Sequence, residues 1–298
     1  VGVKLDLATA FIITGRSTQA VELLRALPEV TGDRRRETLL VTALAAAKGP
    51  VEARREIERL IARYPQDVSI LSLGAEHALS QADYSAARAY LQRALAVEPS
   101  NPGLLGTLAQ TEMRAGSLDA AEAALQRLIE VPGSRTAARL GLVEVARLRG
   151  DAVEVRKGLE QIRADDAGAV VPRLMLARLM LAAAEAAPAA KVLSEVVAIE
   201  PRDAKLRLQV ARLLGEFSRY DEAIRQVRDA VEMAPSASEG WVELARMQLT
   251  LNQSHPARES ATKAVAIDRD SVEAVGLLAL LDLREKRGDS ALNLAVDL

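Results

Sequence analysis

The sequence predicts an all-α chain of stacked helix–turn–helix repeats. Alanine returns at a nearly constant interval of 34 residues along the 298-residue chain, which is typical of stacked helical hairpins. Aromatic residues make up 2% and hydrophobic residues 49%, a composition that suits closely packed helices better than a β-sandwich. No stretch alternates between polar and apolar residues with period two. The recurring residues are Ala20, Ala53, Ala87, Ala121, Ala189, Ala223, Ala257 and Ala291, with Val155 in the one gap.

The period divides the chain into eight complete repeats and a partial ninth. They are 1–33, 34–67, 68–101, 102–135, 136–169, 170–203, 204–237, 238–271 and the partial 272–298. The seventh place of a repeat favours leucine, with Gly74 as the exception, and the eighth favours alanine. Small residues let neighbouring helices approach, and branched aliphatic residues fill the space beside them. We expect a single solenoid over 1–298 that is a piece of a longer protein.

Helix boundaries are predicted by proline, by small polar residues and by glycine. Proline cannot continue a preceding helix, and it stands at four joints between repeats: Pro65, Pro99, Pro201 and Pro235. The residues predicted to cap the next helix are Asp67, Asn101, Asp203 and Asp270. The glycines predicted to form the turn inside a repeat are Gly15, Gly49, Gly116, Gly150 and Gly288.

Composition argues against several classes of function. The net charge is −2, whereas a general nucleic-acid binder needs a basic excess. The chain has no cysteine, and its two histidines, His77 and His255, lie five repeats apart, so a shared metal or catalytic site is not expected. The most apolar stretch, 174–193, carries charges and a proline and is not a membrane span. We therefore expect no enzyme activity, no cofactor, no metal and no membrane insertion.

These columns resemble the tetratricopeptide repeat family along the whole chain. Repeat 238–271 matches the family pattern best, with Trp241, Leu244, Ala245, Ala257 and Ala264 at family places. The resemblance implies a right-handed superhelix whose concave face is lined mainly by the first helix of each repeat. It also implies a scaffold that binds a protein or peptide partner on that face. Because fold does not fix function, a site has to be argued from residues.

Repeats 102–135 and 136–169 depart most from the pattern. Gly133 and Ala167 replace the joint proline, and Val143 and Val155 replace small residues. One interpretation is a softer joint or an altered local twist between about residues 130 and 172. The alternative is ordinary divergence of the repeats.

The candidate partner-binding site is a row of arginines at the ninth place of three consecutive repeats: Arg178, Arg212 and Arg246. Equal places of stacked repeats lie side by side, so the three would form a cationic row on the concave face. Guanidinium groups suit carboxylates and acidic polymers because they donate bidentate hydrogen bonds. The preceding repeats carry Thr9, Thr42, Glu76, Gln110 and Glu144 at this place.

The row has a second interpretation, in which its charges are neutralised within the chain. Arg212 could pair with Glu216, Arg246 with Glu243, and Arg178 with Glu144 in the neighbouring repeat.

Two functions are consistent with these observations. The first is a scaffold for protein–protein interaction. The alanine- and arginine-rich texture is similar to repeat lipoproteins of bacterial PEP-CTERM and exopolysaccharide systems, and to polysaccharide-export regions. That similarity favours a periplasmic or outer-membrane-associated location over a cytoplasmic one. The second function is direct binding or guiding of an anionic polysaccharide during export, with the arginine row as the contact surface.

Overall fold

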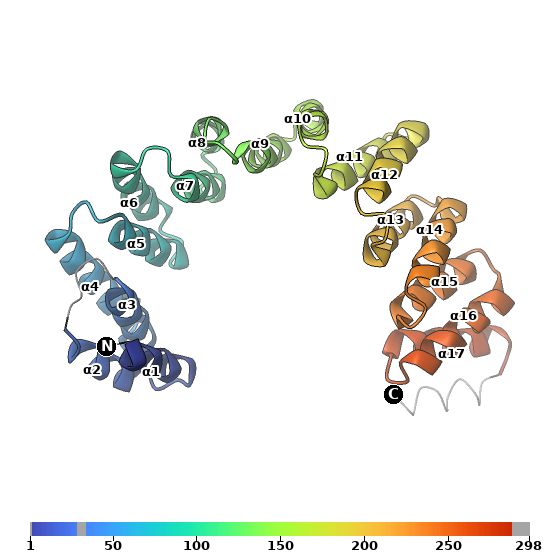
Figure 1. The fold of residues 1–298 in the computed structure, drawn as a ribbon, viewed down its shortest axis with the longest axis horizontal. Helices are drawn as coiled ribbons and strands as arrows, with labels where there is room; N and C mark the ends of the chain where they lie inside the picture. The colour runs from blue at the N-terminus through green and yellow to red at the C-terminus, as the bar shows by residue number, and fades with distance from the viewer. Residues whose placement is uncertain (1, 29–33, 288–298) are drawn as a thin grey trace. The chain divides into compact units, whose positions relative to one another are not determined.

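The computed structural model describes residues 2–28 and 34–287, and this part of the chain holds 17 α-helices joined by turns and no strand (Figure 1). The helices of the first five repeats are α1 Gly2–Ile13, α2 Ser17–Arg25, α3 Arg35–Lys48, α4 Pro50–Arg63, α5 Val68–Ser80, α6 Tyr84–Val97, α7 Pro102–Arg114, α8 Leu118–Ile129, α9 Arg135–Arg149 and α10 Ala152–Asp165. The remaining helices are α11 Val170–Ala182, α12 Ala186–Ile199, α13 Ala204–Glu216, α14 Tyr220–Met233, α15 Ser238–Thr250, α16 Ser254–Ile267 and α17 Val272–Arg284. Each complete repeat thus holds two helices, and the all-α prediction is confirmed.

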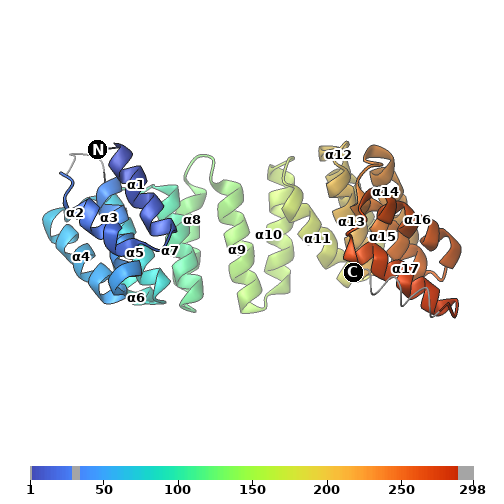
Figure 2. The ribbon, with the colours of Figure 1, turned by 90° about the horizontal axis from the view of Figure 1, so that it is seen from below.

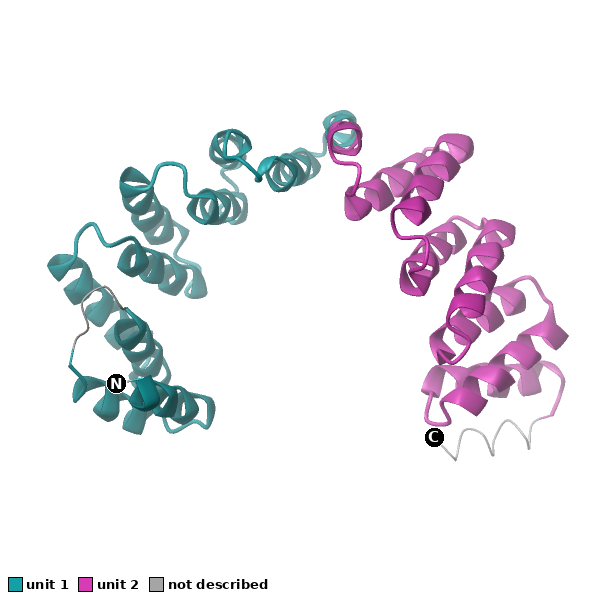
Figure 3. Cartoon of the chain, in the orientation of Figure 1, with its two compact units in different colours: residues 1–158 teal, residues 159–298 magenta. Residues whose placement is uncertain are grey.

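The chain divides into two compact units, residues 1–158 and residues 159–298 (Figure 3). Within each unit most successive helices lie side by side, as α5 and α6 do in the first and α15 and α16 in the second (Figure 2). The boundary falls inside α10, within the stretch where the repeat pattern is irregular. The single solenoid and the softer joint both stay predictions, and hydrogen exchange across residues 130–172 tests the second.

The recurring alanines form the centre of the core. Seven of them are fully buried, at 0% exposure: Ala20, Ala53, Ala87, Ala121, Ala189, Ala223 and Ala257. Val155, which fills the gap, is only half-buried, and Ala291 lies outside the described residues. A methyl group is the largest side chain that allows such close approach of neighbouring helices. The alanine period therefore reports helix contact directly.

Where a repeat carries an unusual residue at one of the recurring places, the residue that packs against it differs in size as well. Gly74 stands where other repeats carry leucine, and a Cβ atom there would lie 3.2 Å from the Tyr90 ring and 3.3 Å from Ile57. The tyrosine thus occupies the space that leucine fills elsewhere. Val143, at an alanine place, packs against Gly158, where a Cβ atom would lie 2.6 Å from the valine Cγ2 atom. Each large residue is accommodated by a small one on the adjoining helix.

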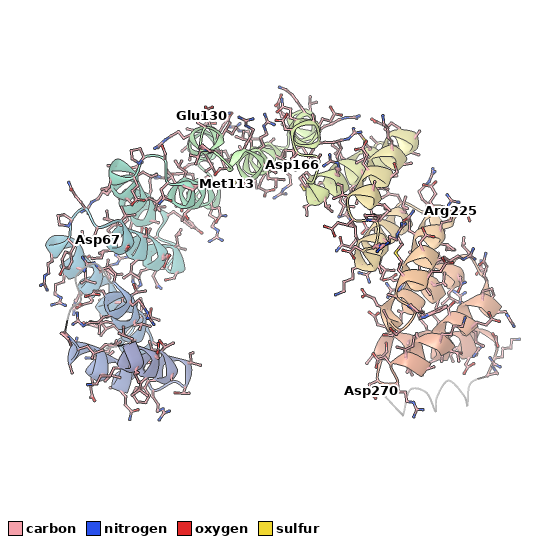
Figure 4. The ribbon with its side chains drawn as sticks, in the orientation of Figure 1. Asp67, Met113, Glu130, Asp166, Arg225 and Asp270 are labelled. Atoms are coloured by element: carbon pink, nitrogen blue, oxygen red, sulfur yellow. The ribbon has the colours of Figure 1, made fainter. Side chains whose placement is uncertain are left out.

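Three of the four predicted N-caps are confirmed. Asp67, labelled in Figure 4, accepts a hydrogen bond from the Ile70 amide at 3.2 Å, and Asn101 and Asp203 accept from backbone amides in the same way. The prediction for Asp270 is wrong, because Ser271 caps α17 and accepts from the Ala274 amide. Asp270 precedes the cap by one residue, so it lies outside the capping geometry.

The turn inside each repeat needs a backbone with positive φ. Glycine supplies it at Gly15, Gly49, Gly116 and Gly150, as predicted, whereas Gly288 lies outside the described residues. In the other repeats the residues with positive φ are Ala82, Ala184, Ser218, Asn252 and Lys286. The turn therefore keeps its positive φ in these repeats even though glycine, which best tolerates it, is absent.

Two of the first helices in residues 159–298 begin without a side-chain cap. Ala169 precedes α11 and Ala237 precedes α15, with φ −72°, ψ 94° and φ −90°, ψ 113°. Asp67, which does cap, has φ −77°, ψ 109°. Ala169→Asp and Ala237→Asp should each raise the free energy of unfolding by about 1 kcal/mol, because an aspartate there can accept from the open amides.

Thermal unfolding of the two variants checks this expectation. Asp203→Ala is the reciprocal control and should lower the melting temperature by a similar amount, since it removes an existing cap. An unchanged melting temperature for both Ala169→Asp and Ala237→Asp would contradict the expectation.

Candidate partner-binding site

The arginine row lies on the first helices of residues 159–298. Arg178, Arg212 and Arg246 come from α11, α13 and α15, and their side chains are 58%, 44% and 50% exposed. All three fall in one compact unit. Each of these side chains is thus partly open to solvent.

Each arginine of the row is paired with a carboxylate on the first helix that follows. Arg178 binds Glu216 of α13. Arg212 binds Glu239 and Glu243 of α15, both at 2.6 Å. These pairs resemble the neutralised interpretation, but the partner that the sequence suggests for Arg212 is wrong.

The predicted partner is correct for the third arginine. Arg246 lies 3.6 Å from Glu243, as suggested, and 3.5 Å from Glu273 of α17. Glu216, expected beside Arg212, binds Arg178 instead. Glu144, expected to pair with Arg178, is bound by Arg147 at 2.5 and 2.7 Å, and this hydrogen bond lowers the pKa of the Glu144 carboxyl.

The pairs differ in how firmly they are held. Glu243 is 5% exposed and lies between Arg212 and Arg246, so it is a fixed part of the row. Burial disfavours the charged form of Arg212, but its hydrogen bonds to Glu243 and Glu239 outweigh that penalty and raise its pKa. The other partners, Glu216, Glu239 and Glu273, are 49%, 52% and 71% exposed. Exposed pairs contribute at most about 1 kcal/mol, so an incoming carboxylate can replace them.

A polar depression opens beside the row between α13, α14 and α15. It has a volume of ≈360 Å³, and Arg212, Arg246, Tyr220, Met247 and Thr250 contribute to its lining. Two guanidinium groups, a phenol and a hydroxyl group meet there, next to a thioether and to the carboxylates of Glu216 and Glu243. This arrangement can bind a carboxylate or another polar group with several directed hydrogen bonds.

Family models match most of the repeat region. Two models described as tetratricopeptide repeat match residues 38–103 and residues 78–139. The chain is a tetratricopeptide-repeat protein. A model described as ChAPs (Chs5p-Arf1p-binding proteins) matches residues 139–260 of this repeat protein.

Solved structures resemble the repeat protein in fold. The C-terminal part of a TPR repeat-containing protein from Cytophaga hutchinsonii is 14% identical, with a TM-score of 0.56, covering 81% of this chain and 99% of its own. Yeast Tom70 is 15% identical with a TM-score of 0.52, covering 94% and 62%. YrrB, titled a TPR protein with an unusual peptide-binding site, is 18% identical with a TM-score of 0.42, covering 62% and 95%. No curated protein sequence matches the chain.

The remaining candidate groups of the repeat protein lie apart from the arginine row. His77 is half-buried, with Nε2 3.0 Å from the Pro50 carbonyl oxygen, and His255 is exposed 3.5 Å from Glu259. Within residues 2–28 and 34–287, no group of three or more potential metal ligands comes together. In the same ranges, no helix has the length and apolar character needed to cross a bilayer.

A second set of arginines in this repeat protein was not anticipated from the sequence. Arg173 and Arg207 occupy the fourth place of repeats 170–203 and 204–237, where the next repeat carries Trp241. Their side chains are 6% and 13% exposed. Trp241 Nε1 donates to the Pro235 carbonyl, and both arginines also reach carbonyls at the joint before their own repeat. Comparison of the fourth place across repeats, where arginine in these two repeats is followed by tryptophan in the next, could have indicated these buried arginines.

Proposed function

We propose that this chain is a scaffold that binds a partner protein along the first helices α11, α13, α15 and α17. The observation that carries the proposal is the arginine row, in which three half-exposed guanidinium groups are paired mostly with exposed carboxylates. Such pairs hold the side chains in a fixed geometry and still exchange readily for a ligand carboxylate. An acidic segment of a partner would displace Glu216, Glu239 and Glu273 while Glu243 stays in place. The row has no catalytic role in this proposal.

The finer setting that we propose is assembly of the bacterial envelope or of an exopolysaccharide system. It rests on the texture of the sequence, which is rich in alanine and arginine. The fold supports a protein-interaction scaffold in any compartment, so this part of the proposal stands on the sequence alone.

Charge reversal of the whole row tests the proposal. We expect the variant Arg178→Glu, Arg212→Glu and Arg246→Glu to bind the partner at least about tenfold more weakly, since each lost charged hydrogen bond contributes about 1.5 kcal/mol or more. The measurement compares partner capture from extracts by immobilised wild-type and variant chains, followed by titration of the captured protein. Equal affinity of a folded variant would remove the row from the site.

Two controls separate charge from folding. Arg225, Arg228 and Arg269 are exposed and make no ion pair in the described part of the chain, so reversing them changes the net charge equally at other places. The neutral variant Arg178→Gln, Arg212→Gln and Arg246→Gln avoids placing new carboxylates beside Glu243. Melting temperatures of all three variants show which of them remain folded.

The second candidate function is binding of an anionic polysaccharide by the same row. Guanidinium groups bind the carboxylates of uronic acids as they bind those of proteins. Titration with alginate, with neutral dextran as the control, distinguishes this function. Binding that weakens steeply with salt and is lost in the row variant would favour the polysaccharide over the protein partner.

A further inference from the structure

A second hollow lies between the start of α13, the end of α14 and the start of α15. We call it the alanine pocket because Ala230, Ala234 and Ala237 line it together with Leu208 and Gly240. Its volume is ≈370 Å³. Ala230 and Leu208 are buried, whereas Ala237 is exposed at the opening. The lining is therefore apolar and the hollow is open on one side.

The pocket exists because small residues stand where other repeats have larger ones. The place of Ala234 is occupied in the other repeats by Tyr64, Glu98, Pro132, Asp166, Glu200 and Asp268. Ala237 stands at a capping place, where other repeats carry Asp67, Asn101 and Asp203. Two side chains are thus missing from one joint. The larger residues at the same places elsewhere indicate that the fold tolerates them.

The rim of the alanine pocket is cationic. Arg202 and Lys205 line the pocket, and both are exposed. Their charged groups make no ion pair in residues 2–28 and 34–287. The two carboxylates at the rim are already engaged: Asp203 accepts from the amides of Lys205 and Leu206, and Glu239 is bound by Arg212. An apolar hollow beside two unpaired cations suits an anionic ligand that has an apolar part.

The pocket also adjoins the arginine row. Lys205 and Arg212 lie on the same helix, seven residues apart, which is about 10 Å along an α-helix. Glu239 lines the alanine pocket and is itself a partner of Arg212. A peptide bound at the row therefore passes within a few residues of the pocket, because an extended chain advances about 3.3 Å per residue.

We propose that the alanine pocket binds one large apolar side chain of the partner, and that Arg202 and Lys205 bind an acidic residue two positions away from it. Residues two apart in an extended chain lie on the same face, about 6.6 Å from each other. The ligand class is an extended acidic segment that contains a single leucine, isoleucine or phenylalanine. This inference rests on the proposed function, and it adds the apolar anchor that gives the site specificity beyond charge.

The test is a fluorescence-anisotropy titration of the full chain with a labelled peptide. The probe is fluorescein–Gly-Glu-Ser-Leu-Ser-Glu-Gly, which carries an acidic residue on each side of leucine. For so short a ligand we expect a dissociation constant on the order of 0.1 mM. Replacing its leucine by serine, or both its glutamates by glutamine, should weaken binding at least about fivefold. No binding of the probe, or equal binding of the serine peptide, would overturn the proposal.

Ala237→Asp is the decisive variant. It introduces a cap at α15, so the chain should stay folded with a raised melting temperature, but it places a carboxylate at the opening of the pocket. We expect at least a tenfold loss of affinity for the probe. Ala169→Asp is the matched control because it introduces the same cap at α11, away from the pocket, and should leave the affinity unchanged.

A second variant tests the cationic rim. Arg202→Glu combined with Lys205→Glu should also lose about tenfold in affinity, and it alters no residue of the arginine row. Probe binding that survives both variants would overturn the pocket. Charge reversal of the arginine row tests the proposed function separately. If that variant loses partner capture while Ala237→Asp captures the partner as the wild type does, the scaffold function is supported and the alanine pocket is excluded from the binding site.

Discussion

Replacing Arg173 by methionine is expected to destabilise the helices around the start of residues 159–298 by about 3 kcal/mol. The buried guanidinium donates to the carbonyl oxygens of Asp166 and Ala169, both at 2.8 Å, and of Arg163 at 2.9 Å. These carbonyls follow or end α10, and methionine cannot donate to any of them. Each lost hydrogen bond from this charged donor to a partly buried acceptor costs about 1 kcal/mol or more.

The setting of Arg173 makes compensation by water difficult. Its side chain is 6% exposed, and its Nε lies 3.6 Å from the Glu195 carboxylate. Arg163 binds the same carboxylate at 2.5 and 2.8 Å, and this hydrogen bond, supported by the charge of Arg173, lowers the pKa of Glu195. Two guanidinium groups and one carboxylate thus tie the end of α10 to α11 and α12. Replacing Arg173 by methionine removes a charged donor from three partly buried backbone oxygens and supplies no donor in its place.

Arg207→Met is the matched control for this expectation. Arg207 occupies the same place in the next repeat, but its closest partners are the side chains of Gln226 at 3.0 Å and Asp229 at 2.8 Å. Asp229 is 46% exposed and can be hydrated when the arginine is lost, so we expect a loss of about 1 kcal/mol. Urea unfolding and hydrogen exchange of the α10–α12 amides measure the difference. Equal losses for the two variants would refute the special role of Arg173.

Arg173 also explains why the repeat pattern describes this joint incompletely. The pattern shows that Ala167 replaces a joint proline, and a softer joint is one prediction from it. Whether a joint is held by other groups depends on side chains that reach across it, and repeat spacing contains no such information. Arg173 reaches across from the following helix. A buried arginine at an aromatic place was the available signal.

Helix positions were predictable because packing imposes them locally. Helix contact requires a small residue at one place of every repeat, and fully buried alanines occupy it in seven repeats. The capping prediction is correct wherever the polar residue directly precedes the helix, as at Asn101, and fails at Asp270, one residue too early. The turn was predictable only where glycine marks it, since Ala184 and Ser218 adopt the same positive φ without any marking residue.

The candidate site was predictable only in part. The period places Arg178, Arg212 and Arg246 at the same place of successive first helices, and the structure has them there, each half-exposed. Their partners depend on how far each helix is shifted along its neighbour, and a long flexible side chain can reach more than one turn. Arg178 accordingly binds Glu216 near the end of α13. The alanine pocket was missed because its signal is the absence of side chains.

Val143 and Gly158 provide the second large effect, a coupling of about 2 kcal/mol between two substitutions. In Gly158→Ala the new Cβ atom would lie 2.6 Å from the Val143 Cγ2 atom. A valine in a helix has one strongly preferred rotamer, so it cannot turn aside cheaply. Overpacking of this kind costs about 1–3 kcal/mol, which exceeds the gain of up to about 1 kcal/mol from replacing a helical glycine. The single variant should therefore be less stable than the wild type.

The opposite change at the partner should remove the clash. Val143→Ala alone leaves a cavity and should cost about 2 kcal/mol. Combined with Gly158→Ala, it recreates the pair that the preceding repeat carries as Ala109 and Ala124. The added methyl group then fills part of the cavity, and the helix gains a better helix former. The double variant should be more stable than the sum of the two single changes predicts.

Gly106→Ala controls for helix propensity alone. Gly106 lies within α7, and a Cβ atom added there would meet nothing within 4 Å, so this variant should be stabilised by about 1 kcal/mol. A complete double-mutant cycle by urea unfolding gives the coupling between Val143 and Gly158. A coupling near zero would mean that α9 and α10 separate freely when their contact changes. A large coupling would mean that Val143 is tolerated at an alanine place only because Gly158 faces it. The departures from the pattern in repeat 136–169 would then be two matched substitutions that preserve the packing of α9 against α10.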